Sequence, residues 1–228
     1  MDYSVDEKKK FLADYLGIDV ENVEEGYSEN IFEIKDSNEE YFVGNYEESY
    51  DAAKEDVINI YEDLGLESFT EDFQDWIIMN AISEDYLDDY ISDIADSQVD
   101  SMDDDDLIQF AIDNGMYTEE DIYEEDEDGE LVIREDFEIE ELRDEVREFI
   151  APSDEADYSE KIDYIEDYYG LDTFKDEIRD ISKGNPDVID IDVVADECIE
   201  EDGIAHFVAS YDGEEIELDD DLYAYRMN

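Results

Sequence analysis

The sequence predicts an α+β protein that is mostly helical, with amphipathic helices and short β-hairpins near both ends of the chain. Helix-capping patterns precede stretches in which apolar residues recur at helical spacing. Turn residues separate short apolar runs near the two ends. The apolar fraction of 42%, with 18 Tyr and 10 Phe, indicates a folded core rather than a disordered acidic chain. We also expect the molecule to be elongated.

The N-terminal part of the chain reads as a helix, a hairpin and a second helix. Ser4 and Glu7 have the spacing of a capping box before the first helix, and Gly17 suits its end. The apolar runs 31–34 and 41–43 flank a polar stretch and predict a hairpin.

The middle of the chain is more helical. The second helix is expected to end at Gly65, and a capping box of Ser68 and Glu71 predicts the start of the next one. Apolar residues between 86 and 95 fall on one face of a further helix, whose other face is acidic. Residues 139–149 have the same helical periodicity.

The last third begins as helix, over residues 158–169, and is expected to end as β structure. Residues 204–211 and 214–218 flank the turn dipeptide Asp212-Gly213, which predicts a hairpin, and 223–225 would add a third strand.

We expect three units, with the clearest boundary at residues 151–153. The stretches around Gly65 and Gly170 resemble one another. A distant duplication would explain this likeness, and so would ordinary helix-stop and helix-start residues. The predicted units are 1–66 (α+β), 67–150 (helical and acidic) and 151–228 (α+β).

The charge balance excludes whole classes of function. The chain carries 79 Asp and Glu against 13 Lys and Arg, a net charge of −66. Nucleic-acid readers need a basic surface against phosphates, so direct DNA or RNA binding is excluded, and anionic membranes are disfavoured for the same reason. No apolar run approaches the roughly 18 residues of a membrane span. The single cysteine excludes an internal disulfide, and the first residues lack the features of a signal peptide, so we expect a cytoplasmic protein.

No enzymatic site is apparent, and we expect neither catalysis nor a cofactor. His206 is the only histidine and falls in a predicted strand. A Cys198–His206 pair would need an orienting group and a nucleophile elbow that the sequence lacks. The glycine-rich phosphate-binding motifs are also missing.

One segment has the pattern of a calcium loop. Glu124 to Glu135 resembles an EF-hand loop at Asp126, Asp128 and Gly129, but has Glu124 where the motif has Asp. A tight turn before a strand at 131–133 is the alternative. The sequence does not decide between a calcium loop and a tight turn, and we assign no metal site to this segment.

The distribution of charge is the most informative feature. No Lys or Arg occurs between Lys54 and Arg134, a window of 79 residues with 29 Asp and Glu. Self-repulsion on this scale destabilises a compact state, which suggests that the negative field itself is functional. Duplex DNA carries one negative charge per ~1.7 Å, so the net charge corresponds to roughly 112 Å of duplex. The expected phosphate surrogates are Asp85, Asp88, Asp89, Asp93, Asp96, Asp103, Asp104, Asp105 and Asp106, with a second patch of Glu119, Glu120, Asp121, Glu124, Glu125 and Asp126.

In its acidic composition, abundant Tyr and acidic helix faces, the chain resembles the DNA-mimic proteins of phages and mobile elements. Those proteins inhibit restriction–modification, CRISPR or related defence enzymes, and they share no fold or signature motif. The resemblance implies a cytoplasmic inhibitor, acting in the host cell if phage-encoded, that occupies the DNA site of a basic DNA-binding protein or nuclease of the host. Two alternatives remain: an acidic chaperone that sequesters basic proteins, and a halophilic-type protein. The sequence also leaves open whether the chain forms a homodimer.

Overall fold

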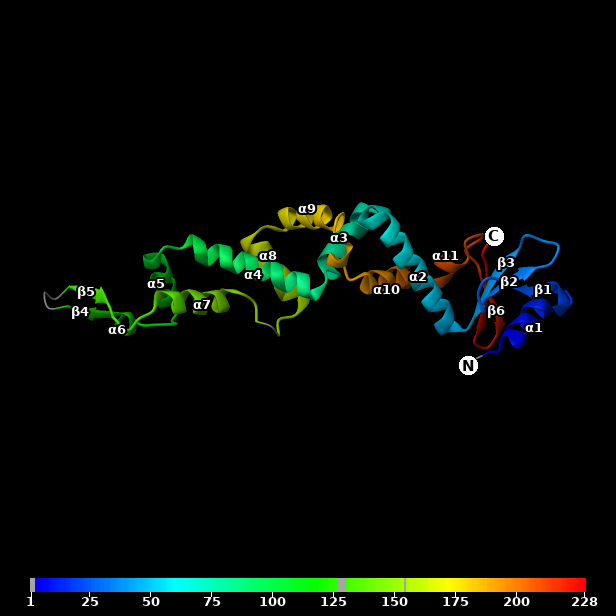
Figure 1. The fold of residues 1–228 in the computed structure, drawn as a ribbon, viewed down its shortest axis with the longest axis horizontal. Helices are drawn as coiled ribbons and strands as arrows, with labels where there is room; N and C mark the ends of the chain where they lie inside the picture. Colours follow the sequence, from blue (N-terminus) through cyan, green and yellow to red (C-terminus); the bar gives the residue numbers. More distant parts are fainter. Residues whose placement is uncertain (1–2, 127–129, 154) are drawn as a thin grey trace. The chain divides into compact units, whose positions relative to one another are not determined.

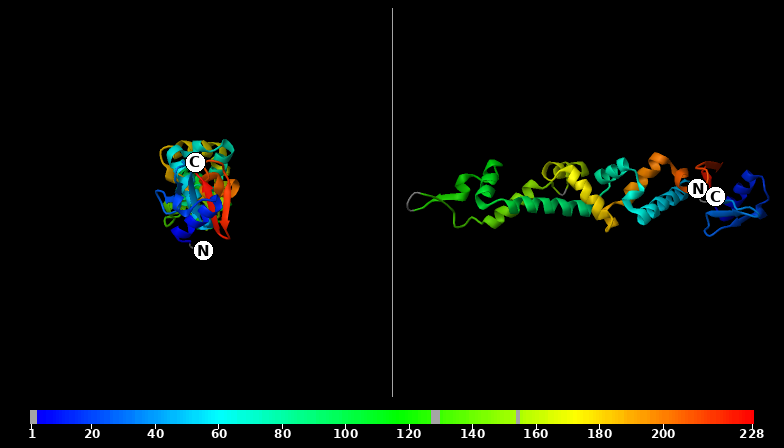
Figure 2. Two further views of the ribbon diagram at one scale, coloured as in Figure 1. Left: turned by 90° about the vertical axis from the view of Figure 1, so that its right-hand side faces the viewer. Right: turned by 90° about the horizontal axis from the view of Figure 1, so that it is seen from above.

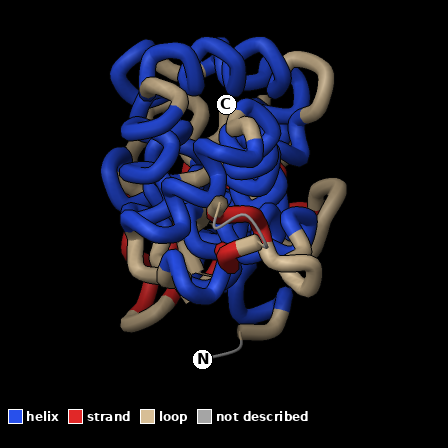
Figure 3. The backbone as a smooth tube through the Cα atoms, turned by 90° about the vertical axis from the view of Figure 1, so that its left-hand side faces the viewer, coloured by secondary structure: helices blue, strands red, loops and turns tan. Residues whose placement is uncertain are grey.

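Helices make up most of the chain and strands are few (Figure 3). The computed structural model describes residues 3–126, 130–153 and 155–228. A small antiparallel sheet combines strands from near both ends, so the predicted α+β, mostly α class is confirmed. The chain divides into two compact units, Met1–Ile77 with Ser182–Asn228, and Ile78–Ile181. Their boundary lies within α3 (Glu71–Asn80) and at the end of α9 (Leu171–Ser182).

The first unit is built on a five-stranded sheet with the order β1-β2-β3-β7-β6. Within it, β3 from the N-terminal part pairs with β7 from the end of the chain, so segments far apart in sequence lie side by side (Figures 1 and 2). The strands are β1 (Val23–Glu25), β2 (Ile31–Ile34), β3 (Glu40–Gly44), β6 (Glu215–Asp219) and β7 (Leu222–Arg226), and the helices are α1 (Val5–Leu16), α2 (Tyr46–Leu64), α10 (Ile191–Asp202) and α11 (Ile204–Val208), with short 3-10 turns η1 (Val20–Asn22), η2 (Gly65–Ser68) and η3 (Pro186–Val188).

Both faces of the middle strands β2, β3 and β7 are largely buried, whereas the edge strands β1 and β6 are more exposed. Phe32 and Val43 belong to a core with Leu12 of α1. Phe42 and Tyr225 point the other way and pack with residues of α2, α10 and α11. The alternation follows from the two-residue period of a strand. Each fully buried side chain of this size contributes about 1.5–3 kcal/mol relative to exposure, so the sheet and its helices stabilise one another.

The start and end of α1 are as predicted. The Glu7 N–H donates to Ser4 Oγ at 3.4 Å, and the Ser4 N–H donates to Glu7 Oε2 at 2.9 Å, which completes a capping box. Gly17 ends the helix with a φ of +69°, a left-handed conformation that glycine adopts without the strain of a Cβ. Residues 31–34 and 41–43 form the predicted hairpin as β2 and β3.

The capping box predicted at Ser68 was wrong. Helix α3 begins at Glu71, and Thr70 Oγ1 accepts the Phe73 N–H at 3.4 Å. Ser68 instead donates its hydroxyl to the Gly65 carbonyl at 2.7 Å, inside a 3-10 turn. Because Ser68 belongs to this turn, the helix begins two residues later and Thr70 takes the capping position.

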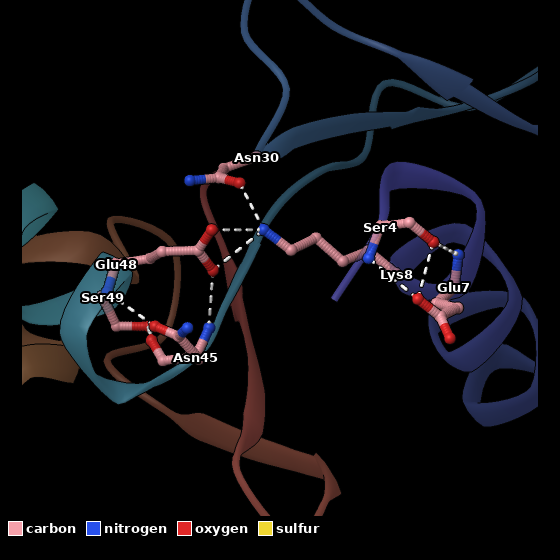
Figure 4. Close-up of polar contacts among 7 residues, drawn as sticks. All are labelled: Ser4, Glu7, Lys8, Asn30, Asn45, Glu48 and Ser49. Carbon is pink, nitrogen blue, oxygen red and sulfur yellow. Dashed lines mark hydrogen bonds and ion pairs between the residues drawn. The ribbon is translucent and has the colours of Figure 1, made fainter. Parts of the chain in front are cut away.

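A buried lysine joins α1 to the start of α2 (Figure 4). Lys8 is 3% exposed, and its Nζ donates to both carboxylate oxygens of Glu48, at 2.7 and 2.8 Å, and to Asn30 Oδ1 at 2.6 Å. Glu48 also accepts the Asn45 N–H at 2.8 Å, as the third residue of the α2 capping box. In a chain with so few cations, one of them is therefore committed to the interior of the first unit.

The strand predicted over residues 204–211 was wrong, because this segment contains the helix α11. Ile204 and Val208 are buried, while His206 between them is exposed. That burial follows the four-residue repeat of a helix, and α11 packs against α2. The C-terminal hairpin lies later in the chain, between β6 and β7, and it includes the predicted third strand at 223–225.

The second unit is a helical assembly with one small hairpin. Its core contains Val99, Leu107, Ile122, Leu142 and Val146, contributed by four successive helices. The longest helix, α4, packs against α7 and α8. The elements are α4 (Glu84–Ser101), α5 (Asp104–Asp113), α6 (Glu119–Ile122), β4 (Tyr123–Glu125), β5 (Leu131–Ile133), α7 (Ile139–Ile150) and α8 (Tyr158–Tyr168), with most of α9.

The observed units differ from the three expected from sequence. Residues 1–66 share a sheet with the end of the chain, and residues 151–153 lie inside the second unit. The likeness between the Gly65 and Gly170 stretches does not extend to local structure. Gly65 opens a 3-10 turn that precedes α3, whereas α9 begins directly after Gly170. This difference favours ordinary helix punctuation over duplication.

Candidate partner-binding surface

The outer side of α4 carries a stripe of carboxylates. Asp85, Asp89 and Asp93 are exposed and make no ion pair with any residue that the structure describes. They are four residues apart, so they lie one above another with a rise of about 6 Å. The same helix buries Leu87 and Ile91 on its opposite side. The amphipathic pattern of α4 thus directs an unneutralised acidic face away from the core.

This stripe continues beyond the predicted set. Asp100 is exposed and follows Asp96 at the same four-residue interval, a regularity that the sequence already shows. Helix α4 holds seven acidic residues over 18 positions, or about one carboxylate per 4 Å of helix length at 1.5 Å per residue. A single DNA strand has one phosphate per ~3.4 Å. Three of the seven, Glu84, Asp88 and Asp96, pair with Lys161 or Arg147. The unpaired carboxylates therefore come at about one per 7 Å, roughly half the charge density of one DNA strand.

Three of the predicted surrogates are held in ion pairs by the fold itself. Lys161 of α8 is 4% exposed and contacts Asp88 at 2.5 Å. Arg147 of α7 pairs with Asp96. Asp104 accepts from Arg143 Nη2 at 2.9 Å. These carboxylates stabilise the packing of the second unit, so their charge is partly cancelled before any partner approaches.

The acidic run 103–106 also has a local role, because it starts a helix. Asp103 Oδ1 accepts the Asp106 N–H at 2.9 Å as the N-cap of α5. The next three aspartates occupy the first turn, where the helix dipole favours negative charge. All four side chains are exposed. Asp105 and Asp106 make no ion pair among the described residues, so they remain available at the surface.

The second predicted patch covers α6 and β4. Glu119, Glu120, Glu124 and Glu125 are all exposed. Asp121 caps α6: its Oδ2 accepts the Thr118 hydroxyl at 2.6 Å and the Thr118 N–H at 2.9 Å, and these hydrogen bonds lower the pKa of Asp121. Asp126 is exposed and accepts the Glu130 N–H at 2.9 Å.

Cations in the second unit are committed to neighbouring acids. This unit has 40 Asp and Glu against 6 Lys and Arg, a net charge of −34 over 104 residues. Among the residues that the structure describes, at least five of the six basic side chains form ion pairs with aspartates. Besides the three above, Arg134 pairs with Asp136 and Arg179 with Asp176. The remaining surface charge is overwhelmingly negative. The first unit carries −32, so the charge is shared by both units.

Tyrosines beside the acidic stripe face the helix packing rather than the outside. Tyr86 and Tyr90 are half-buried and stack on one another. Tyr90 donates its hydroxyl to Glu177 of α9 at 2.6 Å, and Tyr169 donates to the other oxygen of Glu177 at 2.6 Å. Burial, followed by the hydrogen bond to Glu177, raises the pKa of Tyr90. These rings therefore act mainly as structural contacts between α4 and α9.

Cys198 and His206 line one hollow of about 410 Å³ in the first unit, together with Ile60, Phe69 and Phe73. Burial, followed by the nearby acids of α10, raises the pKa of Cys198 to about 11. The thiol is thus protonated at neutral pH, which is the opposite of what a nucleophilic cysteine needs. His206 lies on α11 and not on a strand. The geometry gives this pair no catalytic activation.

The calcium-loop pattern falls on a β-hairpin. Tyr123 pairs with Ile133, and Glu125 with Leu131, so the strand expected at 131–133 is present. Asp128 and Gly129 lie outside the described residues. Among the residues that are described, no group of three or more His, Cys, Asp or Glu is arranged to hold a metal ion.

A comparison with protein-family models, curated proteins and solved structures found no match to this chain. Within residues 3–126, 130–153 and 155–228, every helix is too short or too polar to cross a lipid bilayer.

Proposed function

We propose that the chain is an acidic DNA mimic, which binds a DNA-binding host defence enzyme and inhibits it by occupying its DNA site. Restriction–modification enzymes, CRISPR effectors and similar nucleases are the target class. The observation that carries this proposal is the acidic stripe of α4, defined as the exposed Asp85, Asp89, Asp93 and Asp100, on a unit whose cations are largely paired.

Closely spaced negative charge supports this proposal. An enzyme channel lined with Lys and Arg binds DNA largely because it neutralises closely spaced phosphates. Unpaired carboxylates at about one per 7 Å along a rigid helix, with the exposed Asp105 and Asp106 of α5, offer the same channel a regular array of negative charge. The helix has a buried apolar side, so the spacing is fixed by the fold. Unlike a phosphodiester, a carboxylate surface contains no bond that a nuclease cleaves.

Affinity capture from bacterial lysate at low salt, followed by displacement of labelled duplex DNA, tests the proposal. We expect DNA-binding enzymes to be recovered at about 50 mM KCl and released by about 200 mM, because electrostatic binding falls steeply over this range. The protein should then displace duplex from the captured enzyme. Recovery of no DNA-binding protein at low salt refutes the proposal.

Two charge-matched triple variants show whether position matters. Asp85→Asn, Asp89→Asn and Asp93→Asn together neutralise three carboxylates of the α4 stripe. The control neutralises three exposed carboxylates of α2 in the other unit: Glu55→Gln, Glu62→Gln and Asp63→Asn. Both raise the net charge equally. We expect the first variant to weaken displacement by about tenfold or more and the second by much less. Equal weakening would mean that total charge, not the α4 surface, determines binding.

A further inference from the structure

The β4–β5 hairpin presents an apolar strand to solvent at the edge of the acidic surface. Leu131, Val132 and Ile133 are 66%, 38% and 40% exposed. The hairpin extends beyond α5 and α6 within the second unit (Figure 1). Within the described residues its sheet has only two strands, so neither strand has a second neighbour. A strand of three consecutive exposed aliphatic residues is unusual at an open sheet edge, where natural proteins place charges or proline.

The register of the hairpin places Tyr123, Leu131 and Ile133 on one face. Tyr123 lies opposite Ile133, and Glu125 lies opposite Leu131, so these four side chains share a face. Val132 and Glu124 occupy the other face. The apolar face thus runs from Tyr123 through Ile133 to Leu131, with Glu125 at its outer margin.

The root of the hairpin is firmly anchored. Ile122 is fully buried, and Tyr123 packs against the core of the second unit. The Arg134 N–H donates to the Ile122 carbonyl at 2.9 Å, which extends the ladder beyond the last strand pair. An apolar face on a pre-ordered support loses little conformational entropy when it docks.

The charges around this face determine what can cover it. From Glu119 to Asp136 the described residues carry nine Asp and Glu and one Arg, and that Arg134 is paired with Asp136. A second copy of the chain would bring the same carboxylates against these, and like charges in contact are strongly unfavourable. A cationic protein surface would neutralise them. The charge therefore protects the apolar edge from self-association and leaves it open to a basic partner.

We propose that the β4–β5 hairpin is an apolar anchor that docks into an apolar depression bordered by Lys and Arg on the partner protein. This inference rests on the proposed function, since the partner is the same basic DNA-binding enzyme. It adds a contribution that salt does not screen: the acidic surface supplies the salt-dependent attraction, and Leu131 with Ile133 supplies contact that persists once the charges are paired.

Two synthetic peptides of equal length and charge test the anchor. One alternates Lys with Leu and the other alternates Lys with Ser, and the Kd for each is measured by fluorescence anisotropy over a range of KCl concentrations. We expect the native protein to prefer the Lys–Leu peptide by about tenfold. Leu131→Ser combined with Ile133→Thr should reduce this preference to about twofold, with an unchanged salt dependence. The single variant Leu131→Ser, at the more exposed position, should lose part of it.

Leu64→Ser is the matched control, because Leu64 is 65% exposed and lies on α2 in the other unit. We expect this variant to keep the native preference. The anchor is overturned if the hairpin variant retains the full preference, or if the native protein shows no preference for the Lys–Leu peptide. In either case, salt-dependent binding of both peptides would leave the DNA-mimic proposal standing. Absence of salt-dependent binding to either peptide overturns both.

Discussion

Replacing the buried lysine of the first unit should cost far more stability than replacing its sequence neighbour. Lys8 donates to three acceptor atoms within 2.6–2.8 Å, and it is 3% exposed. Breaking a buried ion pair costs about 3–5 kcal/mol when the remaining charge stays buried. The Glu48 side chain is 34% exposed and still accepts a hydrogen bond from Asn45. Water can therefore solvate its carboxylate when Lys8 is absent, which reduces the cost. We therefore expect Lys8→Met to reduce the free energy of unfolding by about 2–3 kcal/mol.

Lys9→Met is the control. Lys9 contacts Glu25 at 2.8 Å, but the Glu25 side chain is 58% exposed. An exposed pair of this kind contributes less than about 1 kcal/mol. Both substitutions make the net charge one unit more negative, so the difference between them isolates the buried contact from general repulsion.

Urea unfolding followed by tryptophan fluorescence measures the difference, because Trp76 is the only tryptophan and belongs to the first unit. With a slope of about 1–3 kcal/mol per molar urea, Lys8→Met should lower the midpoint by about 1–2 M. Lys9→Met should change it by less than half of that. Equal midpoints for the two variants would refute the assignment of Lys8 as a structural contact.

Three further outcomes follow from charge and burial. Raising KCl from about 0.05 to about 0.5 M should raise the melting temperature by several degrees because it screens self-repulsion, whereas a requirement for molar salt in order to fold would favour the halophilic alternative. Burial raises the pKa of Tyr61, Tyr158 and Tyr164 from 10.0 to about 12. The stabilising effect of these neutral phenols is complete below pH 10 and is lost as pH rises through 12, so tyrosinate absorbance should show a late-titrating group that disappears in urea. Cys198, with its pKa raised from 9.0 to about 11, should react slowly with a disulfide reagent at neutral pH and rapidly after unfolding, and fast labelling of the folded protein would contradict its burial.

The sequence was sufficient where structure is decided within a few residues. The Ser4–Glu7 capping box and the helix end at Gly17 were predicted correctly, since each depends on a pattern within a few residues. The strand at 204–211 was predicted wrongly, because a short apolar run is compatible with both the repeat of a strand and the repeat of a helix. Packing against α2 selects the helix α11, and that contact is not visible in the local sequence.

The candidate surface was predictable only in part, for a related reason. The exposure of Asp85, Asp89 and Asp93 follows from the helical repeat of their apolar neighbours. The ion pairs of Asp88 and Asp96 cannot be predicted from this repeat. Their partners Lys161 and Arg147 come from helices more than 50 positions further along the chain. Elongation of the molecule and the identity of its partner stay predictions.

The central claim is that this protein and DNA compete for one site on the target enzyme. The most direct test measures the apparent Kd of the protein for a captured enzyme while the concentration of duplex DNA is increased at fixed ionic strength. We expect the apparent Kd to rise in proportion to the DNA concentration, and no complex to contain both. A ternary complex of enzyme, DNA and this protein, with the apparent Kd unchanged at saturating DNA, would contradict the claim.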